Sequence, residues 1–132
     1  MADIAEAIYA RLNGDSTLTG LLNGGIHAYT PKTTPARPYI TYHLISLAER
    51  PHAMGSDPAL VVDRYQVDIW ADSYPKTIEV SNEVNRLLSR WVGSAAGVSV
   101  NAAYQVDRRD LYEDEPELFR RSIDFELAWF ES

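Results

Sequence analysis

The segment that closes this chain constrains its fold more than any other. Between residues 118 and 130, apolar and polar side chains alternate along most of the length. Successive side chains of a β-strand point to opposite faces of the sheet, so this period indicates one buried and one solvent-facing side. We therefore predict a long final strand that is tied into a sheet. Its apolar set is Phe119, Ile123, Phe125, Leu127 and Trp129, and its polar set is Arg120, Ser122, Asp124 and Glu126.

Further stretches show the same period. The clearest is 60–71, where Tyr65, Val67 and Ile69 alternate with polar residues. The others are rich in aromatic and β-branched residues, which favour strands. The sequence therefore predicts long strands over 39–47, 60–71 and 98–106, with a short one before them over 26–29.

Apolar residues recur at helical spacing in two places. An amphipathic helix is predicted over 3–12. A longer helix is predicted over 73–91, where Val84 and Leu88 belong to a stripe that we expect to be buried, and Pro75 suits the first turn. Three segments are interpreted as loops from their proline, glycine or charge content: 30–38, 48–58 and 107–117.

Together these patterns predict an α+β fold. Hairpin-paired strands joined by a long helix are typical of helices packed on one face of an antiparallel sheet, here of about four strands. The chain has 132 residues, of which 45% are apolar, and contains no long linker. We therefore expect residues 1–132 to form one domain with one core.

The composition argues against several classes of protein. The net charge is −7, and the basic pairs Arg108–Arg109 and Arg120–Arg121 are flanked by carboxylates. A nucleic-acid reader needs clustered basic residues, so we do not expect one. No stretch approaches the roughly 20 apolar residues of a membrane span, and the N-terminus does not resemble a signal peptide. The absence of cysteine excludes disulfides and thiolate metal sites.

Residue patterns typical of catalysis or metal binding are missing from the sequence. His27, His43 and His52 lack the spacing of a metal site. The Gly-x-Ser-x-Gly elbow of serine hydrolases is absent. The acidic run from Asp110 to Glu117 lacks the order of a calcium loop and is interpreted as solvated surface. We predict no catalytic residues, no cofactor and no metal.

Segments 48–58 and 107–117 are long for hairpin connections, which usually take about two to five residues. Long extensions on a small sheet commonly contact partners, although unstructured loops are the alternative interpretation. The predicted partner-contact residues are Arg50, His52 and Met54 in the first segment, and Arg109, Leu111 and Tyr112 in the second.

Taken in order, these segments resemble the tail-completion or tail-terminator proteins of long-tailed bacteriophages and of phage-like gene transfer particles. The resemblance covers nearly the whole chain, beginning with the N-terminal helix. The segments that carry it are Ile26–His–Ala–Tyr–Thr–Pro31, Pro38–Tyr–Ile–Thr–Tyr42, Asp63–Arg–Tyr–Gln–Val–Asp–Ile–Trp–Ala71, the 107–112 region and Ile123–Asp–Phe–Glu–Leu–Ala–Trp129.

The resemblance implies a structural virion protein and not an enzyme. Such proteins are small α+β domains that assemble as homo-oligomers, here expected as a six-membered ring. The ring caps the tail tube, contacts the tube protein on one side and the head–tail connector on the other, and lets DNA pass without sequence-specific binding. The resemblance places the protein in the tail or neck of the virion, assembled in the host cytoplasm and away from membranes.

Two other functions stay open on the residues alone. A small hydrolase could use the acidic run, or Ser56 together with His52. The chain could also be a soluble binding or adaptor module. Ring formation by the purified protein would separate the structural function from both.

Overall fold

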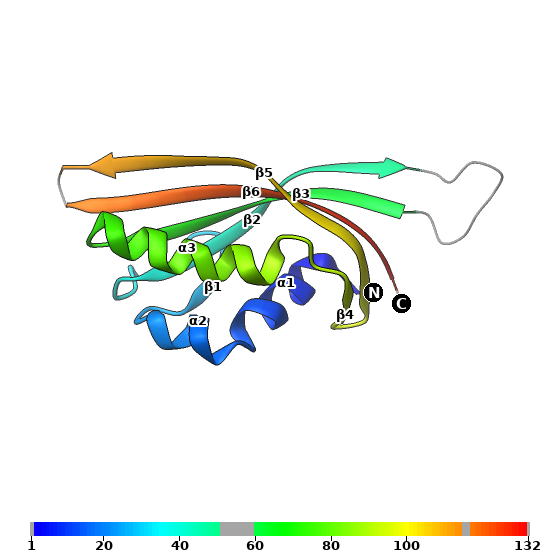
Figure 1. Cartoon of the computed structure of the whole chain (residues 1–132), viewed down its shortest axis with the longest axis horizontal. Helices are drawn as coiled ribbons and strands as arrows, with labels where there is room; N and C mark the ends of the chain where they lie inside the picture. The colour runs from blue at the N-terminus through cyan, green and yellow to red at the C-terminus, as the bar shows by residue number, and fades with distance from the viewer. Residues whose placement is uncertain (1, 51–59, 115–116, 132) are drawn as a thin grey trace.

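The computed structural model describes residues 2–50, 60–114 and 117–131. Helices and strands account for most of these residues (Figure 1). No helix in the described ranges is long and apolar enough to cross a membrane. The elements in chain order are α1 (Ile4–Asn13), α2 (Ser16–Leu21), β1 (Ile26–Ala28), β2 (Tyr39–Arg50), β3 (Leu60–Ala71), α3 (Tyr74–Leu88), β4 (Gly93–Ala95), β5 (Val98–Glu113) and β6 (Leu118–Glu131).

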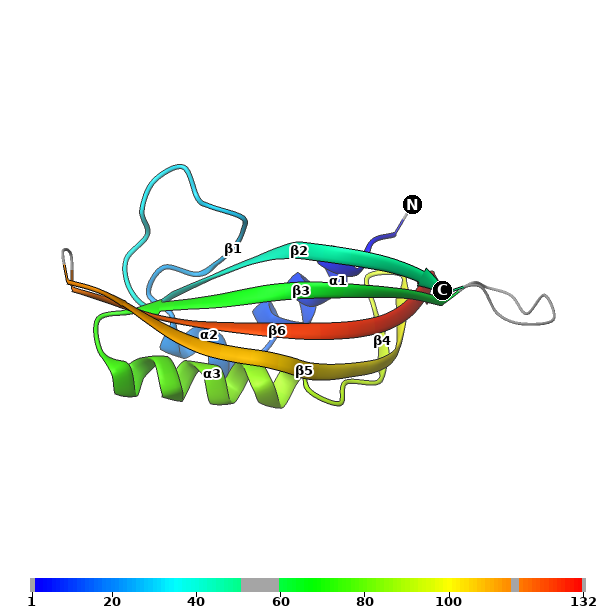
Figure 2. The ribbon, with the colours of Figure 1, turned by 90° about the horizontal axis from the view of Figure 1, so that it is seen from above.

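The strands form one curved sheet in the order β1-β2-β3-β6-β5-β4. β1 runs parallel to β2, and every other neighbouring pair is antiparallel. Figure 2 shows the four long strands side by side. The predicted fold, an antiparallel sheet of about four strands with helices on one face, is therefore wrong: the sheet is mixed, has six strands and dominates the molecule.

Two short edge strands account for much of this difference. The strand predicted over 26–29 exists, but it lies parallel to β2. The loop of residues 29–38 makes this possible, because it returns the chain to the end of the sheet at which β1 begins. β4 consists of Gly93, Ser94 and Ala95, which have little intrinsic strand preference. It forms because the turn at Ala96 and Gly97, both with positive φ, folds it back onto β5.

The helix α3 connects β3 to the second half of the sheet. β3 and β5 both run antiparallel to β6, which lies between them. The long strands before and after the helix, β3 and β5, are therefore parallel to each other but are not neighbours, because the final strand lies between them. The short strand β4, which directly follows the helix, runs antiparallel to β5. The final strand thus holds the two halves of the sheet together.

One face of the sheet packs against the helices and forms the core. α1 begins at its cap Asp3, whose side chain accepts a hydrogen bond from the Ala5 N–H at 2.8 Å. α3 buries Val84 and Leu88 completely, which confirms their predicted placement. The residues on the sheet side of this core include Ile40, Val67, Ile69, Ile123, Phe125 and Leu127.

Two of the three segments predicted as loops are largely strand where the structure describes them. β5 continues to Glu113 and pairs with β6 as far as Leu118, so the interpretation of 107–117 as a charged loop is wrong for residues 107–113. The charged residues stay in the strand because they form ion pairs with their neighbours in the sheet, such as Arg121 with Asp110. β2 likewise extends to Arg50, and residues 51–59 lie outside the described residues.

The two ends of the described chain lie close together. The Ala2 backbone N–H donates to the Glu131 carboxylate at 2.7 Å. This contact lies at the end of the sheet where β6 pairs with the start of β3, and both termini are visible there in Figure 1.

A buried carboxylate in the core gives a test of the packing. Asp63 on β3 is only 5% exposed, and its Oδ1 has no hydrogen-bond partner among the described residues. Burial raises the pKa of Asp63 above its usual value. The folded state therefore disfavours the ionised form, and the free energy of unfolding falls as pH rises above the unfolded pKa of 3.8.

Replacing Asp63 with asparagine removes that charge. We expect the Tm of Asp63→Asn minus the Tm of the wild type to be more positive at about pH 7 than at about pH 3. At about pH 7 the wild-type carboxyl is ionised in the unfolded chain, whereas at about pH 3 it is neutral in both states. Thermal unfolding of both proteins at the two pH values measures the difference. An equal change in Tm at both pH values would contradict this assignment.

Candidate assembly surface

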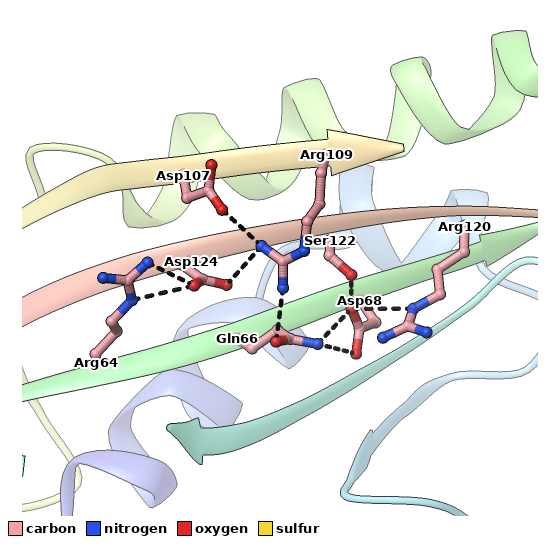
Figure 3. A network of polar contacts seen from close by, with 8 residues as sticks. All are labelled: Arg64, Gln66, Asp68, Asp107, Arg109, Arg120, Ser122 and Asp124. Carbon is pink, nitrogen blue, oxygen red and sulfur yellow. Dashed lines mark hydrogen bonds and ion pairs between the residues drawn. The ribbon is translucent and has the colours of Figure 1, made fainter. Parts of the chain in front are cut away.

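The sheet face opposite the helices carries a network of charged and polar side chains (Figure 3). They come from β3, β5 and β6, at the positions that alternate with the core. The expectation that the polar side of the last strand simply faces water is wrong, because Ser122 is 0% and Asp124 is 5% exposed. Neighbouring side chains cover them by pairing across the strands.

Asp124 lies at one centre of this network. Its Oδ2 accepts hydrogen bonds from Arg64 Nε at 3.0 Å and from Arg64 Nη2 at 2.8 Å. Its Oδ1 is 3.5 Å from Nη1 of Arg109. A buried carboxylate needs such donors, because burying a charge without a partner is costly. The two arginines, from the strands on either side of β6, thus compensate Asp124.

Arg109 connects this centre to the rest of the network. Its Nη1 donates to Asp107 at 2.8 Å, and its Nη2 donates to Gln66 Oε1 at 2.9 Å. The Gln66 amide in turn donates to the Asp68 carboxylate at 3.0 Å. Arg109, which was predicted to contact partners, forms polar contacts with Asp107, Gln66 and Asp124 of its own chain.

Asp68 is the second centre, and it is 3% exposed. It accepts hydrogen bonds from Gln66 and from the Ser122 hydroxyl, and Arg120 Nε lies 3.4 Å from its Oδ1. The eight side chains in Figure 3 include three arginines and three aspartates, so their formal charges balance. The arrangement is suited to fixing three strands in register and to presenting a charge-balanced surface.

A second polar cluster ties the end of the β5–β6 hairpin to the helix layer. Arg121 donates to Asp110 at 2.8 Å, to Ser81 Oγ at 3.1 Å and to the Tyr74 hydroxyl at 3.1 Å. The Arg121 guanidinium, with a smaller contribution from Tyr74, holds the pKa of Asp110 below its usual value. Asp110 was part of the predicted acidic run and has a structural contact here.

An aromatic pocket of about 430 Å³ lies on the same face as the network. Tyr39 stacks on Trp70 with ring centroids 5.8 Å apart, and the Arg120 guanidinium lies 4.8 Å from the Trp70 ring. The indole N–H of Trp70 donates to Thr41 Oγ1 at 3.0 Å. The aromatic side chains of this region therefore contact one another and the Arg120 guanidinium.

The predicted contact residues are distributed unevenly over the structure. Leu111 and Tyr112 lie on β5 and are 43% and 49% exposed. The Tyr112 ring lies 4.7 Å from that of Phe119, so one side of it rests on the hairpin. Arg50 lies at the end of β2, whereas His52 and Met54 fall outside the described residues. The structure therefore brings Arg109, Leu111 and Tyr112 together on one strand.

The network of polar residues was not predicted as a site. The available signal was the period-two placement of Arg64, Gln66 and Asp68 on one strand and of Ser122 and Asp124 on another. Without the sheet register, nothing in the sequence shows that these strands are neighbours. Within the described part of the chain, no group of three or more His, Asp or Glu side chains could hold a metal ion.

Comparison with solved structures finds the same fold elsewhere. A chain in the virion of a native gene transfer agent particle aligns with a TM-score of 0.76 at 16% sequence identity, over 99% of this chain and 96% of that one. A second solved chain aligns with a TM-score of 0.62, also at 16% identity, over 98% and 96%. No curated protein matches the sequence at a significant level.

The sequence itself matches one family model over residues 6–129, which extends from within the first helix to within the last strand. The model describes the tail completion protein gp17. It covers every strand of the sheet and almost all of the helical layer. This chain therefore belongs to the tail completion protein gp17 family, whose members are structural proteins of the phage tail.

Proposed function

We propose that this protein completes the tail of a phage or of a phage-like gene transfer particle, as a ring that caps the tail tube and joins it to the head connector. The observation that carries the proposal is the family match over residues 6–129. The fold shared with a chain of a gene transfer agent virion supports the same assignment. The expected ring has six copies, with the tube protein on one side and the connector on the other.

The charge distribution supports a ring through which DNA passes without binding. The chain carries a net charge of −7, and the three arginines of the sheet network are paired with aspartates. Phosphate binding needs basic side chains that are free to replace counterions. A surface of this kind offers DNA few such groups. The protein acts by holding other structural proteins in place, not by catalysis.

We propose that Leu111 and Tyr112 contribute to contacts in the assembled particle, with Arg109 beside them. Leu111 and Tyr112 are exposed on a strand of the sheet, where they can be covered without unfolding the chain. Arg50, His52 and Met54 are proposed as contacts at the opposite hairpin. Of the residues behind the hydrolase alternative, Ser56 and His52 lie outside the described residues, and Asp110 of the acidic run is bonded to Arg121 and Tyr74.

Deletion of the gene from the particle that encodes it tests the proposed function. We expect filled heads and separate tails, and we expect the wild-type gene supplied in trans to restore joined particles. The control is a synonymous recoding of the gene, which should leave assembly unchanged. Joined, infectious or DNA-transferring particles in the absence of the protein would contradict the proposal.

A further inference from the structure

Two stretches of backbone in the sheet have an open outer edge. β1 covers β2 only as far as Tyr42, whose carbonyl accepts a hydrogen bond from the Tyr29 N–H at 2.9 Å. At the other edge, β4 covers β5 as far as Val100, and the Arg90 N–H donates to the Ala103 carbonyl at 2.7 Å. Beyond these points, no described residue forms backbone hydrogen bonds to the outer side of 43–50 or 104–113.

The two open edges lie on opposite sides of the sheet and toward opposite ends of it. The open part of β2 belongs to the β2–β3 hairpin, and that of β5 to the β5–β6 hairpin (Figures 1 and 2). β2 runs antiparallel to β3, β3 to β6, and β6 to β5. A second copy that continues the sheet would therefore set its β5 antiparallel to β2 of the first, which preserves the alternation.

Both edges carry exposed apolar side chains. Leu44 and Ile45 are 39% and 45% exposed on β2, and Tyr104 and Val106 are 59% and 43% exposed on β5. Every residue from 104 to 113 is exposed, although the strand pairs with β6 on its inner side at every position except Val106, which lies in a bulge. Such a strand is a template for pairing with another chain, and proline and lysine are two of the residues that proteins use to block it; each segment here carries one bulge instead. Neither 43–50 nor 104–113 contains either residue.

The two segments also have compatible charges. The sequence of the β2 segment ends in Glu49 and Arg50, and the β5 segment contains Asp107, Arg108 and Asp110. Each segment therefore has both signs of charge, and an antiparallel pair can place opposite charges across from each other. A chain that carries both complementary edges can satisfy each of them with another copy of itself.

We propose that copies of this protein join edge to edge, with residues 43–50 of one copy hydrogen-bonded to residues 104–113 of the next. The contact is heterologous, because each copy offers a different edge to each neighbour, and such contacts close into rings when the rotation allows. This inference rests on the proposed function, from which it takes that the linked copies close into a ring. It adds that the sheet is continuous between subunits and that the β5 segment with Leu111 and Tyr112 is the subunit contact.

Cysteine cross-linking tests this contact, because the natural chain contains no cysteine. The variant Ser46→Cys/Val106→Cys places one thiol on each open edge, and a short bismaleimide relaxes the need for one exact register. Treated rings or assembled particles are expected to give a ladder of covalent oligomers on a denaturing gel. Each single variant is expected to run as a monomer on the denaturing gel, because a thiol on one edge only has no second thiol on the neighbouring copy within reach.

The matched control is Ser46→Cys/Thr17→Cys, whose second thiol is exposed on the helix α2 away from both edges. It should give no ladder under the same conditions. Wild-type Tm in every variant confirms that folding is intact. Native mass spectrometry of the same samples reports separately whether closed oligomers exist.

The outcomes separate the inference from the proposed function. A ladder from the edge pair alone supports the inference. Closed rings without that ladder, or with an equal ladder from the control, overturn the edge contact and leave the proposed function standing. Dimers from a single variant overturn the heterologous arrangement. Absence of oligomers in both solution and particles overturns the edge contact together with the proposed ring.

Discussion

Phe125→Ala is expected to lower the free energy of unfolding by about 3–5 kcal/mol, the largest effect of any single truncation that we propose. Phe125 is completely buried at the centre of β6, where it pairs with Tyr65 of β3 and Gln105 of β5. Truncation removes apolar contacts and leaves a cavity that the fixed strands on both sides cannot fill.

Urea denaturation of the wild-type and variant proteins measures this loss. A lower midpoint with an unchanged slope would show that stability alone has changed. Val92→Ala is the control, because Val92 is 71% exposed and lies outside the proposed subunit contact, and it should cost less than about 0.5 kcal/mol. A loss below about 1 kcal/mol for Phe125→Ala would mean that β6 does not form the centre of the core.

Arg64→Ala is expected to cost about 2–3 kcal/mol, which is far more than an ordinary surface arginine contributes. The reason lies in the partner: the Asp124 side chain is 7% exposed, whereas the Arg64 side chain is 36% exposed. Removing Arg64 leaves a buried carboxylate with only the longer contact to Arg109. Removing Asp124 instead leaves two arginines that can turn toward water, so Asp124→Ala should cost less.

The double variant Arg64→Ala/Asp124→Ala should recover part of the loss seen in Arg64→Ala, because the uncompensated charge is gone. Chemical denaturation of the four proteins of this cycle measures the coupling. The control is Arg86→Ala, whose side chain is 49% exposed and pairs with Glu83 and Asp15, and it should cost less than about 1 kcal/mol. Equal losses for Arg64→Ala and Arg86→Ala would show that the sheet network contributes no more than a surface pair.

The strands and helices with one clear apolar face could be predicted from the sequence. The helix α3 and the strands around Val67 and Phe125 bury the side chains that their periodicity indicates. In these elements local pattern and tertiary packing agree, so residue order alone is informative. The predicted helix over 73–91 differs from α3 only at its ends, where boundaries are least certain.

The rest of the fold depends on contacts between segments far apart in the chain. The far half of β5 has charged residues on both faces, so its alternation is hidden until β6 provides ion-pair partners such as Arg121. β4 is a strand only because a turn places it beside β5. The sheet network needs the order β3-β6-β5, in which the last strand of the chain lies between two earlier strands. No local pattern in the sequence specifies that order.

The contact between Ala2 and Glu131 has a practical consequence for handling this protein. Because the two ends emerge side by side, an affinity tag or fluorescent fusion occupies nearly the same space whichever terminus carries it. That space adjoins the start of β3, beside the hairpin whose outer edge is open. Swapping a tag from one end to the other therefore gives little relief from crowding, whereas a circular permutant opened in the loop between β1 and β2 would move the ends elsewhere.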